Sequence, residues 1–128
     1  MVDNTTDVFV YTGIGEGAVV PKDVVRVRID PSVLVIPEHA FFQQRQLETI
    51  ELHDGIREIG YNAFSGCAAL REVRLSDGVE RIGCSTFSGC RKFTKFRSPP
   101  LVITIPNGML NSCRRIFSFS HQLIHLFF

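Results

Sequence analysis

A nine-residue stretch that occurs twice, 23 residues apart, constrains the fold of this chain more than any other feature. Residues 59–67 read IGYNAFSGC and residues 82–90 read IGCSTFSGC, with the same residue at six of the nine positions. Chance rarely gives such agreement in a short chain, so we interpret the chain as a tandem repeat. Because one repeat of this length cannot bury its apolar side chains alone, the repeats are expected to stack on one another.

Each repeat contains a segment with the apolar pattern of a half-buried strand. In residues 47–52 (LETIEL), apolar residues occupy the first, fourth and sixth positions, and the last three residues alternate between apolar and polar. The pattern recurs at residues 70–75 (LREVRL) and, one period earlier, at residues 24–29 (VVRVRI). Residues 93–98 (FTKFRS) keep all but the last apolar position. Stacking would place these segments side by side as parallel strands about 4.8 Å apart.

A turn, an apolar pair and then the nine-residue stretch follow each strand. Asp54-Gly55 and Asp77-Gly78 are strong turn pairs. We expect the nine-residue stretch to form one or two turns of α-helix or 3-10 helix, with its Ile, Ala, Phe and Cys residues buried and its glycines at the bends. The apolar residues that lie three apart, and that are expected to point inward, are Val33 with Ile36, Ile56 with Ile59, Val79 with Ile82, and Val102 with Ile105.

The succession leucine-x-x-isoleucine-x-leucine, turn, isoleucine-glycine, alanine-phenylalanine and glycine-cysteine resembles the BspA-type leucine-rich repeat, whose period also fits. The resemblance covers roughly residues 24–119 and is strongest in residues 36–97. It implies an α/β fold, a right-handed leucine-rich repeat solenoid in the form of a short horseshoe. Parallel strands would line the concave side, and short helical turns and strands the convex side. It also implies a non-catalytic scaffold, on cell surfaces or inside cells, because the family motif contains no catalytic residue.

The pattern divides the chain into three parts. Residues 1–23 are expected to form an N-terminal segment or cap, in which glycines and valines replace the helical motif. Residues 24–119 hold about four repeats, which is above the roughly three that a stable stack needs. Residues 120–128 form a degenerate apolar tail. The last unit is therefore expected to be either a cap or the end of a truncated array.

The composition fits a single domain with an ordinary balance of residue types. Of the 128 residues, 45% are hydrophobic and 21% are charged. Fourteen basic and thirteen acidic side chains give a net charge of +1, which gives no support to binding of nucleic acid or of a membrane surface. No signal peptide or membrane-spanning stretch of about 20 apolar residues is visible. An intracellular location with reduced thiols is therefore favoured.

Three of the four cysteines share one position of the repeat. Cys67, Cys90 and Cys113 each fall at the end of the expected helical turn. A small, weakly polar side chain at such a position is expected to be buried and reduced, rather than part of a disulfide or a metal site. Cys84 lies outside this column and is expected to be the more reactive thiol.

No pattern of residues predicts a cofactor, a metal ion or a catalytic centre. His121 and His125 are four residues apart, but the zinc site that this spacing allows would need further ligands. The alternating glycines of residues 13–17 lack the spacing of a phosphate-binding loop, so a plain turn is expected. The sequence contains no nucleophile elbow and no paired-carboxylate motif.

The outward positions of the strands form three columns along the stack, with six basic and three acidic residues. One interpretation is a solvated sheet with cross-strand arginine–glutamate pairs. The other is a polar docking face for a protein partner of acidic character. In that case Arg28, Arg74 and Arg97 should matter most, because arginine is favoured at interface hot spots. The candidate partner-binding residues are Arg26, Arg28, Glu48, Glu51, Arg71, Glu72, Arg74, Lys95 and Arg97.

Two other kinds of interaction are weighed against this docking face. Residues 91–97 (RKFTKFR) interleave aromatic and basic residues, as nucleic-acid platforms do, but Phe93 and Phe96 fall in buried columns, so nucleic acid is not favoured. The alternative function is a structural role in which the chain self-associates through the exposed ends of the stack. The phenylalanines that would mediate it are Phe117, Phe119, Phe127 and Phe128.

Overall fold

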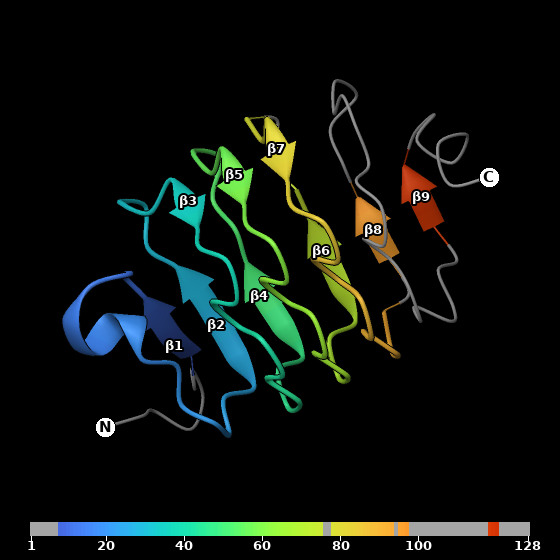
Figure 1. The fold of residues 1–128 in the computed structure, drawn as a ribbon, viewed down its shortest axis with the longest axis horizontal. Helices are drawn as coiled ribbons and strands as arrows, with labels where there is room; N and C mark the ends of the chain where they lie inside the picture. Colours follow the sequence, from blue (N-terminus) through green and yellow to red (C-terminus); the bar gives the residue numbers. More distant parts are fainter. Residues whose placement is uncertain (1–7, 76–77, 94, 98–117, 121–128) are drawn as a thin grey trace.

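The chain folds into a stack of coils in which two parallel sheets run along the stack (Figure 1). The computed structural model describes residues 8–75, 78–93, 95–97 and 118–120. Within these residues, a six-stranded sheet has the order β1-β2-β4-β6-β8-β9, and a three-stranded sheet has the order β3-β5-β7. Each strand therefore pairs with the strand one coil away, which is the arrangement expected of a leucine-rich repeat solenoid.

The strands are short, and all of their pairings are parallel. A 3-10 helix, η1, spans Gly15–Ala18 after the first strand. The smaller sheet contains β3 (Val35–Ile36), β5 (Glu58–Ile59) and β7 (Arg81–Ile82). The larger sheet contains β1 (Val8–Tyr11), β2 (Arg26–Ile29), β4 (Thr49–Glu51), β6 (Glu72–Arg74), β8 (Lys95–Arg97) and β9 (Ser118–Ser120).

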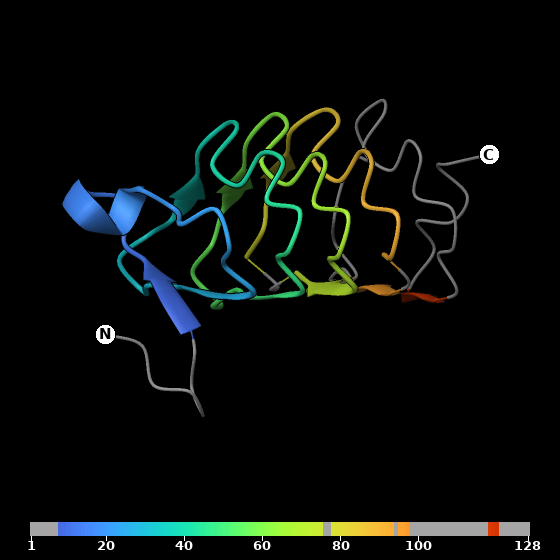
Figure 2. The ribbon, with the colours of Figure 1, turned by 90° about the horizontal axis from the view of Figure 1, so that it is seen from below.

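The register of the sheets confirms the repeat period. Arg26 pairs with Thr49, Thr49 with Glu72, and Glu72 with Lys95, so each of the steps from β2 to β8 advances by 23 residues. The smaller sheet has the same step, because Ile36 pairs with Ile59 and Ile59 with Ile82. Figure 2 shows the two layers from below, with the six-stranded sheet along the lower edge and the turn segments along the upper edge.

The core fills the space between the two sheets and the turn segments. The expected inward pairs are buried in the first three coils, for example Val33 with Ile36 and Ile56 with Ile59. Three phenylalanines from successive coils stack on one another. Their ring centroids lie 5.2 Å apart from Phe41 to Phe64 and 5.4 Å apart from Phe64 to Phe87, and the rings are almost parallel. The pair Val102 and Ile105 lies outside the described residues.

The nine-residue stretch forms a run of tight turns in place of the expected helix. In residues 60–70, successive backbone bonds link Ala63 N to Gly60 O, Ser65 N to Asn62 O and Cys67 N to Phe64 O. Asn62 and Gly66 adopt positive φ, which interrupts any continuous helix. The remaining backbone groups bond to the next coil instead, as when Phe64 N–H donates to Thr86 O at 2.9 Å. The expectation of a helix was therefore wrong in these coils.

The glycines of the nine-residue stretch were expected at bends, and this was right for Gly66 and Gly89 only. Gly66 and Gly89 have φ near +77°, as bends that favour glycine do. Gly60 and Gly83 are needed for a different reason, the close approach of the preceding coil. A Cβ atom at Gly60 would lie 2.5 Å from Glu38 N, and one at Gly83 would lie 2.4 Å from Tyr61 N.

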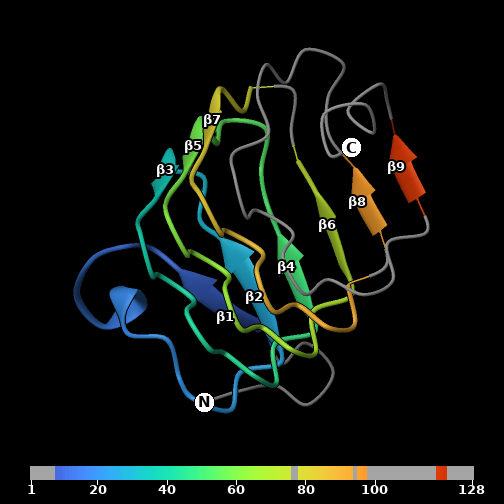
Figure 3. The ribbon, with the colours of Figure 1, turned by 45° about the vertical axis from the view of Figure 1, so that its right-hand side comes forward.

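The N-terminal part of the chain contributes to the solenoid from residue 8 onward. Strand β1 pairs with β2 in parallel, and η1 follows it (Figures 1 and 3). Tyr11 is buried and its ring lies 5.0 Å from that of Phe41, so this segment covers the first coil of the core. The apolar tail at residues 120–128 lies outside the described residues, apart from Ser120 at the end of β9.

Candidate binding face on the parallel strands

The residues that the sequence singled out lie on or directly before strands of the six-stranded sheet. We call the surface formed by the outward positions of β2, β4, β6 and β8 the strand face. Arg26, Arg28, Glu51 and Arg71 are exposed. Glu48 and Glu72 are half-buried. Arg74, Lys95 and Arg97 are placed by the backbone register of β6 and β8. The stacking therefore brings candidates from successive coils onto one sheet.

Two ion pairs join neighbouring coils across this face. Arg28 Nε lies 2.8 Å from Glu51 Oε2, and Arg71 Nη2 lies 3.8 Å from Glu48 Oε1. These are the arginine–glutamate pairs expected for a solvated sheet. Because the side chains of Arg28 and Glu51 are more than half exposed, each such pair should contribute at most about 1 kcal/mol to stability. Their main effect is to neutralise charge on the face.

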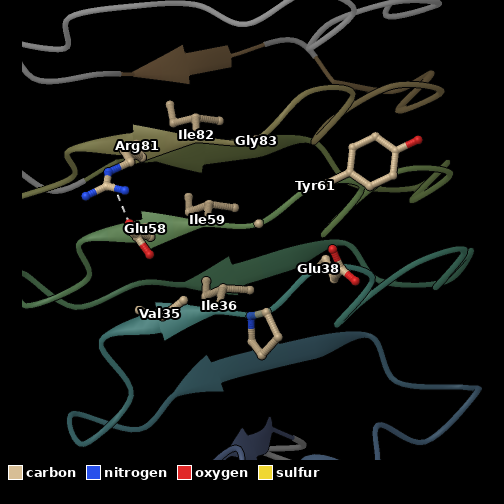
Figure 4. A pocket seen from close by; sticks show the side chains of 11 residues that line it. Val35, Ile36, Glu38, Glu58, Ile59, Tyr61, Arg81, Ile82 and Gly83 are labelled. Carbon is tan, nitrogen blue, oxygen red and sulfur yellow. Dashed lines mark ion pairs between the residues drawn. The ribbon is translucent and has the colours of Figure 1, made fainter.

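The sequence did not predict a trough on the smaller sheet (Figure 4). Its volume is about 420 Å³. Val35, Glu58 and Arg81 lie along one side and Glu38 and Tyr61 along the other, with Gly83 in between. Gly60 also lines the trough. The signal was present in the repeat, since the residues that flank each glycine recur at fixed positions. It was missed because the glycines were assigned to bends.

The walls of this trough combine polar and apolar groups. Arg81 Nε lies 3.1 Å from Glu58 Oε1 across the β5–β7 pair. Val35 is 46% exposed and Tyr61 48% exposed, so apolar surface faces solvent on both sides. The floor offers few free backbone donors, because Gly60 N–H donates to Ile36 O at 2.8 Å and Gly83 N–H to Ile59 O at 2.7 Å.

The cysteines of the described residues lie as the sequence predicted. Cys67 and Cys90 are buried and reduced, and Cys84 is exposed. Each buried thiol donates to a carbonyl of the preceding coil, with Cys67 Sγ 3.1 Å from Phe41 O and Cys90 Sγ 3.2 Å from Phe64 O. Burial raises the pKa of Cys67 to about 12, so this thiol is neutral and poorly nucleophilic. Cys113 lies outside the described residues.

The histidines of the described residues have structural partners. His39 is exposed and makes edge contacts with Phe42 and Tyr61. His53 is half-buried. Its Nδ1 accepts a bond from Gly55 N–H, which leaves Nε2–H to donate to Val33 O at 2.7 Å. His121 and His125 lie outside the described residues.

The described part of the chain carries neither a cluster of metal ligands nor a membrane-spanning helix. No group of three or more His, Cys, Asp or Glu side chains there comes together as a metal site would require. Nor does that part of the chain contain a helix long and apolar enough to cross a membrane.

The comparisons with known proteins agree with the stacked geometry. The family model described as "BspA type Leucine rich repeat region" matches residues 12–123 in six copies. The matched region begins ahead of residue 24, where the sequence pattern placed the first repeat. No curated protein sequence is significantly similar to the chain.

Two solved structures share the fold. The leucine-rich repeat protein TpLRR of T. pallidum is 35% identical, with a TM-score of 0.71, over 74% of this chain and 44% of that protein. A leucine-rich repeat protein of Bacteroides ovatus is 27% identical, with a TM-score of 0.54, over 75% of this chain and 31% of that protein. The chain thus spans less than half the length of either protein.

Proposed function

Because this chain belongs to the BspA-type leucine-rich repeat family, we propose that it is a non-catalytic scaffold that binds a protein partner through the strand face. The family implies a protein-interaction scaffold in general. The choice of the strand face is our own inference from the geometry. Catalysis is not part of the proposal, because leucine-rich repeat proteins are typically non-enzymatic.

The observation that carries the proposal is the flat array of exposed polar side chains on β2 and β4, which the register continues onto β6 and β8. Apolar side chains of these strands, such as Val27 and Ile50, are buried, so the face is free of the side chains that build the core. Rows of polar groups on a rigid sheet suit recognition of a protein surface, where electrostatic complementarity gives specificity.

Site-specific photocrosslinking tests this assignment of the binding face. The photoreactive residue benzoylphenylalanine is placed at Thr49, which is exposed at the centre of the strand face. The matched control carries it at Arg57, an exposed residue beside the smaller sheet. In cells that produce the chain, we expect a crosslinked product of defined mass from position 49 and none from position 57. Crosslinking from position 57 alone, or from neither position, would contradict the proposal.

A second candidate function is self-association through the N-terminal end of the stack. In the described sheet, β1 pairs only with β2, so its other edge is open. The strand reads VFVY, with neither the charges nor the prolines that protect edge strands, and Val10 is 39% exposed. A cavity of about 300 Å³ adjoins it, lined by Val8, Phe9, Val10, Pro21, Asp23, Val24 and Val25.

Sedimentation velocity over a range of concentrations tests this second function. Self-association should appear as a sedimentation coefficient that rises with concentration in the wild type and stays constant in Val10→Lys, which places a charge on the edge strand. A monomer at every concentration would remove the candidate. The phenylalanines that the sequence suggested for this role, at positions 117, 127 and 128, lie outside the described residues, and only the strand position of Phe119 is described.

A further inference from the structure

The ion pairs described on the strand face lie in its first coils. In the first coils, the two ion pairs Arg28–Glu51 and Glu48–Arg71 remove two arginines from those able to meet a partner. Arg26 is exposed there, but its register neighbours, Val8 and Thr49, are uncharged, so it stands as a single cation.

The register of β6 and β8 places two arginines beside each other. Arg74 is the direct partner of Arg97 in the parallel pairing. Adjacent strands lie about 4.8 Å apart, and like charges directly opposite each other destabilise a sheet. Two residues earlier, Glu72 pairs in register with Lys95, so these two neighbouring positions carry opposite charges. The backbone register therefore sets two arginine positions next to each other, where a carboxylate from a partner could bridge the two charges.

We propose that the strand face binds an acidic segment of its protein partner over β6 and β8, with a carboxylate held between positions 74 and 97. This inference rests on the function proposed above and names the chemistry of the partner. Arginine is suited to this role because its guanidinium binds carboxylates in a bidentate manner. Arg28, at the same position of the repeat, is excluded because Glu51 already occupies its guanidinium.

The distribution of acids on the face favours a protein over a nucleic acid. Glu48, Glu51 and Glu72 stand among the basic residues, so the face has no continuous row of cations for the phosphates of a nucleic-acid strand to follow. A protein segment can place its acidic residues over the arginines and neutral or basic residues over the glutamates. The net charge of +1 for the whole chain agrees with such local complementarity, not with a general attraction of polyanions.

Fluorescence anisotropy with a labelled oligoglutamate peptide tests the proposal, with an oligoglutamine peptide of equal length as control. The wild type should bind oligoglutamate only, and more weakly as salt is added. Arg74→Gln and Arg97→Gln should each weaken binding about tenfold, and Arg74→Lys less. The matched variant Arg28→Gln, at the same repeat position, should change binding less than twofold. Thermal unfolding of each variant shows whether it remains folded. If one of the variants at positions 74 and 97 does not fold, the other still tests the proposal.

The possible outcomes distinguish this inference from the proposed function. Equal losses in Arg28→Gln and Arg74→Gln, or no binding of oligoglutamate, would overturn the acidic site at positions 74 and 97. Crosslinking from position 49 would still support the strand face in that case. Tighter binding of single-stranded oligothymidylate than of oligoglutamate, with loss in the same two variants, would overturn the choice of a protein segment.

Discussion

At the scale of single residues, two columns of left-handed backbone run through the turn segments. His39, Asn62 and Ser85 share one such column, with φ between 56° and 60°. A second column contains Gln43, Gly66 and Gly89. Glycine adopts this conformation without strain, whereas for other residues it costs roughly 1–2 kcal/mol of conformational free energy. The first coil therefore carries strain at Gln43 that the later coils avoid.

Replacing this strained residue should stabilise the protein. Gln43→Gly removes the strain, and the added freedom of glycine in the unfolded chain offsets part of the gain, so we expect about 0.5–1 kcal/mol more stability. Urea denaturation measures the change. Gln46→Gly is the control, since Gln46 does not have positive φ and should lose stability on the same substitution. A loss of stability in Gln43→Gly would show that its side chain matters more than its backbone.

Burial of Cys67 links stability to alkaline pH. The pKa of this thiol is raised from 9.0 to about 12 because burial penalises the thiolate. In the unfolded chain the thiol ionises near pH 9, while in the folded chain it remains neutral, so unfolding releases a proton above pH 9. The contribution of the neutral thiol is complete below pH 9 and is lost as pH rises toward 12.

The pH dependence can be isolated with Cys67→Ala. Below pH 9, the variant should be less stable than the wild type by about 2 kcal/mol, from the lost packing and the lost bond to Phe41 O. Above pH 9, the stability of the wild type relative to the variant should fall by about 1.4 kcal/mol per pH unit, so the variant should become the more stable protein above roughly pH 10.5. Denaturant titrations of both proteins at a series of pH values measure it. A difference that stays constant over this range would mean that Cys67 ionises freely in the folded chain.

At the scale of elements, the strands of the smaller sheet depend on glycines that let successive coils approach closely. Gly60 follows β5 and Gly83 follows β7, and each lies against the backbone of the preceding coil. Pro37 holds the corresponding position after β3 in the first coil. The same glycines line the trough and add no side chain to it. Close packing and surface shape therefore have one cause.

A methyl group at this position should force the coils apart. Gly60→Ala places its Cβ within 3 Å of three backbone atoms of Pro37 and Glu38, which cannot move as a flexible side chain would. We expect a loss of about 2–3 kcal/mol, as in overpacked cores. Pro37→Ala, at the same position in the first coil, should cost less than about 1 kcal/mol. Thermal and urea denaturation measure both, and equal losses would argue against the close approach as the cause.

At the scale of the whole molecule, stability should vary along the stack. Each coil bonds mainly to its neighbours, so the molecule behaves as a nearly one-dimensional array. Strand β4 pairs with a neighbour on both sides, and β1 pairs on one side within the described sheet. The stacked rings of Phe41, Phe64 and Phe87 also join three successive coils, with Phe64 contacted on both sides. The centre should therefore be the last part to open.

Native-state hydrogen exchange can show this gradient. We expect the amides of Thr49–Glu51 to exchange more slowly than those of Val8–Tyr11, because opening the edge strand disrupts one pairing and opening the central strand disrupts two. The measurement follows individual amides under conditions that favour the folded state. Equal protection in both strands would instead indicate a single cooperative unit.

Much of this architecture could be predicted from the sequence because the same pattern of residues recurs in each repeat. Val27, Ile50 and Val73 recur at one position and are buried in one column. The outward residues between them, such as Thr49, lie on the strand face. The alternation of apolar and polar residues along a strand determines on which face of the sheet a side chain lies. The repeat period determines which residue of the next coil lies beside it. The location of the candidate residues on one sheet followed from these two facts alone.

What only the tertiary structure decided were the contacts between coils, because they depend on how closely neighbouring backbones approach. The sequence showed a glycine at positions 60 and 83. Only the structure shows that a Cβ atom there would lie 2.5 Å or 2.4 Å from a backbone nitrogen of the preceding coil, so that glycine is needed for space and not for a bend. It showed arginines in one column, but the bond from Arg28 to Glu51 removes one of them from the set open to a partner. The repeat by itself determined which residues share a column. The geometry of stacking determined which of them already form ion pairs, because ion pairing depends on distances between side chains, and the repeat period does not specify these distances.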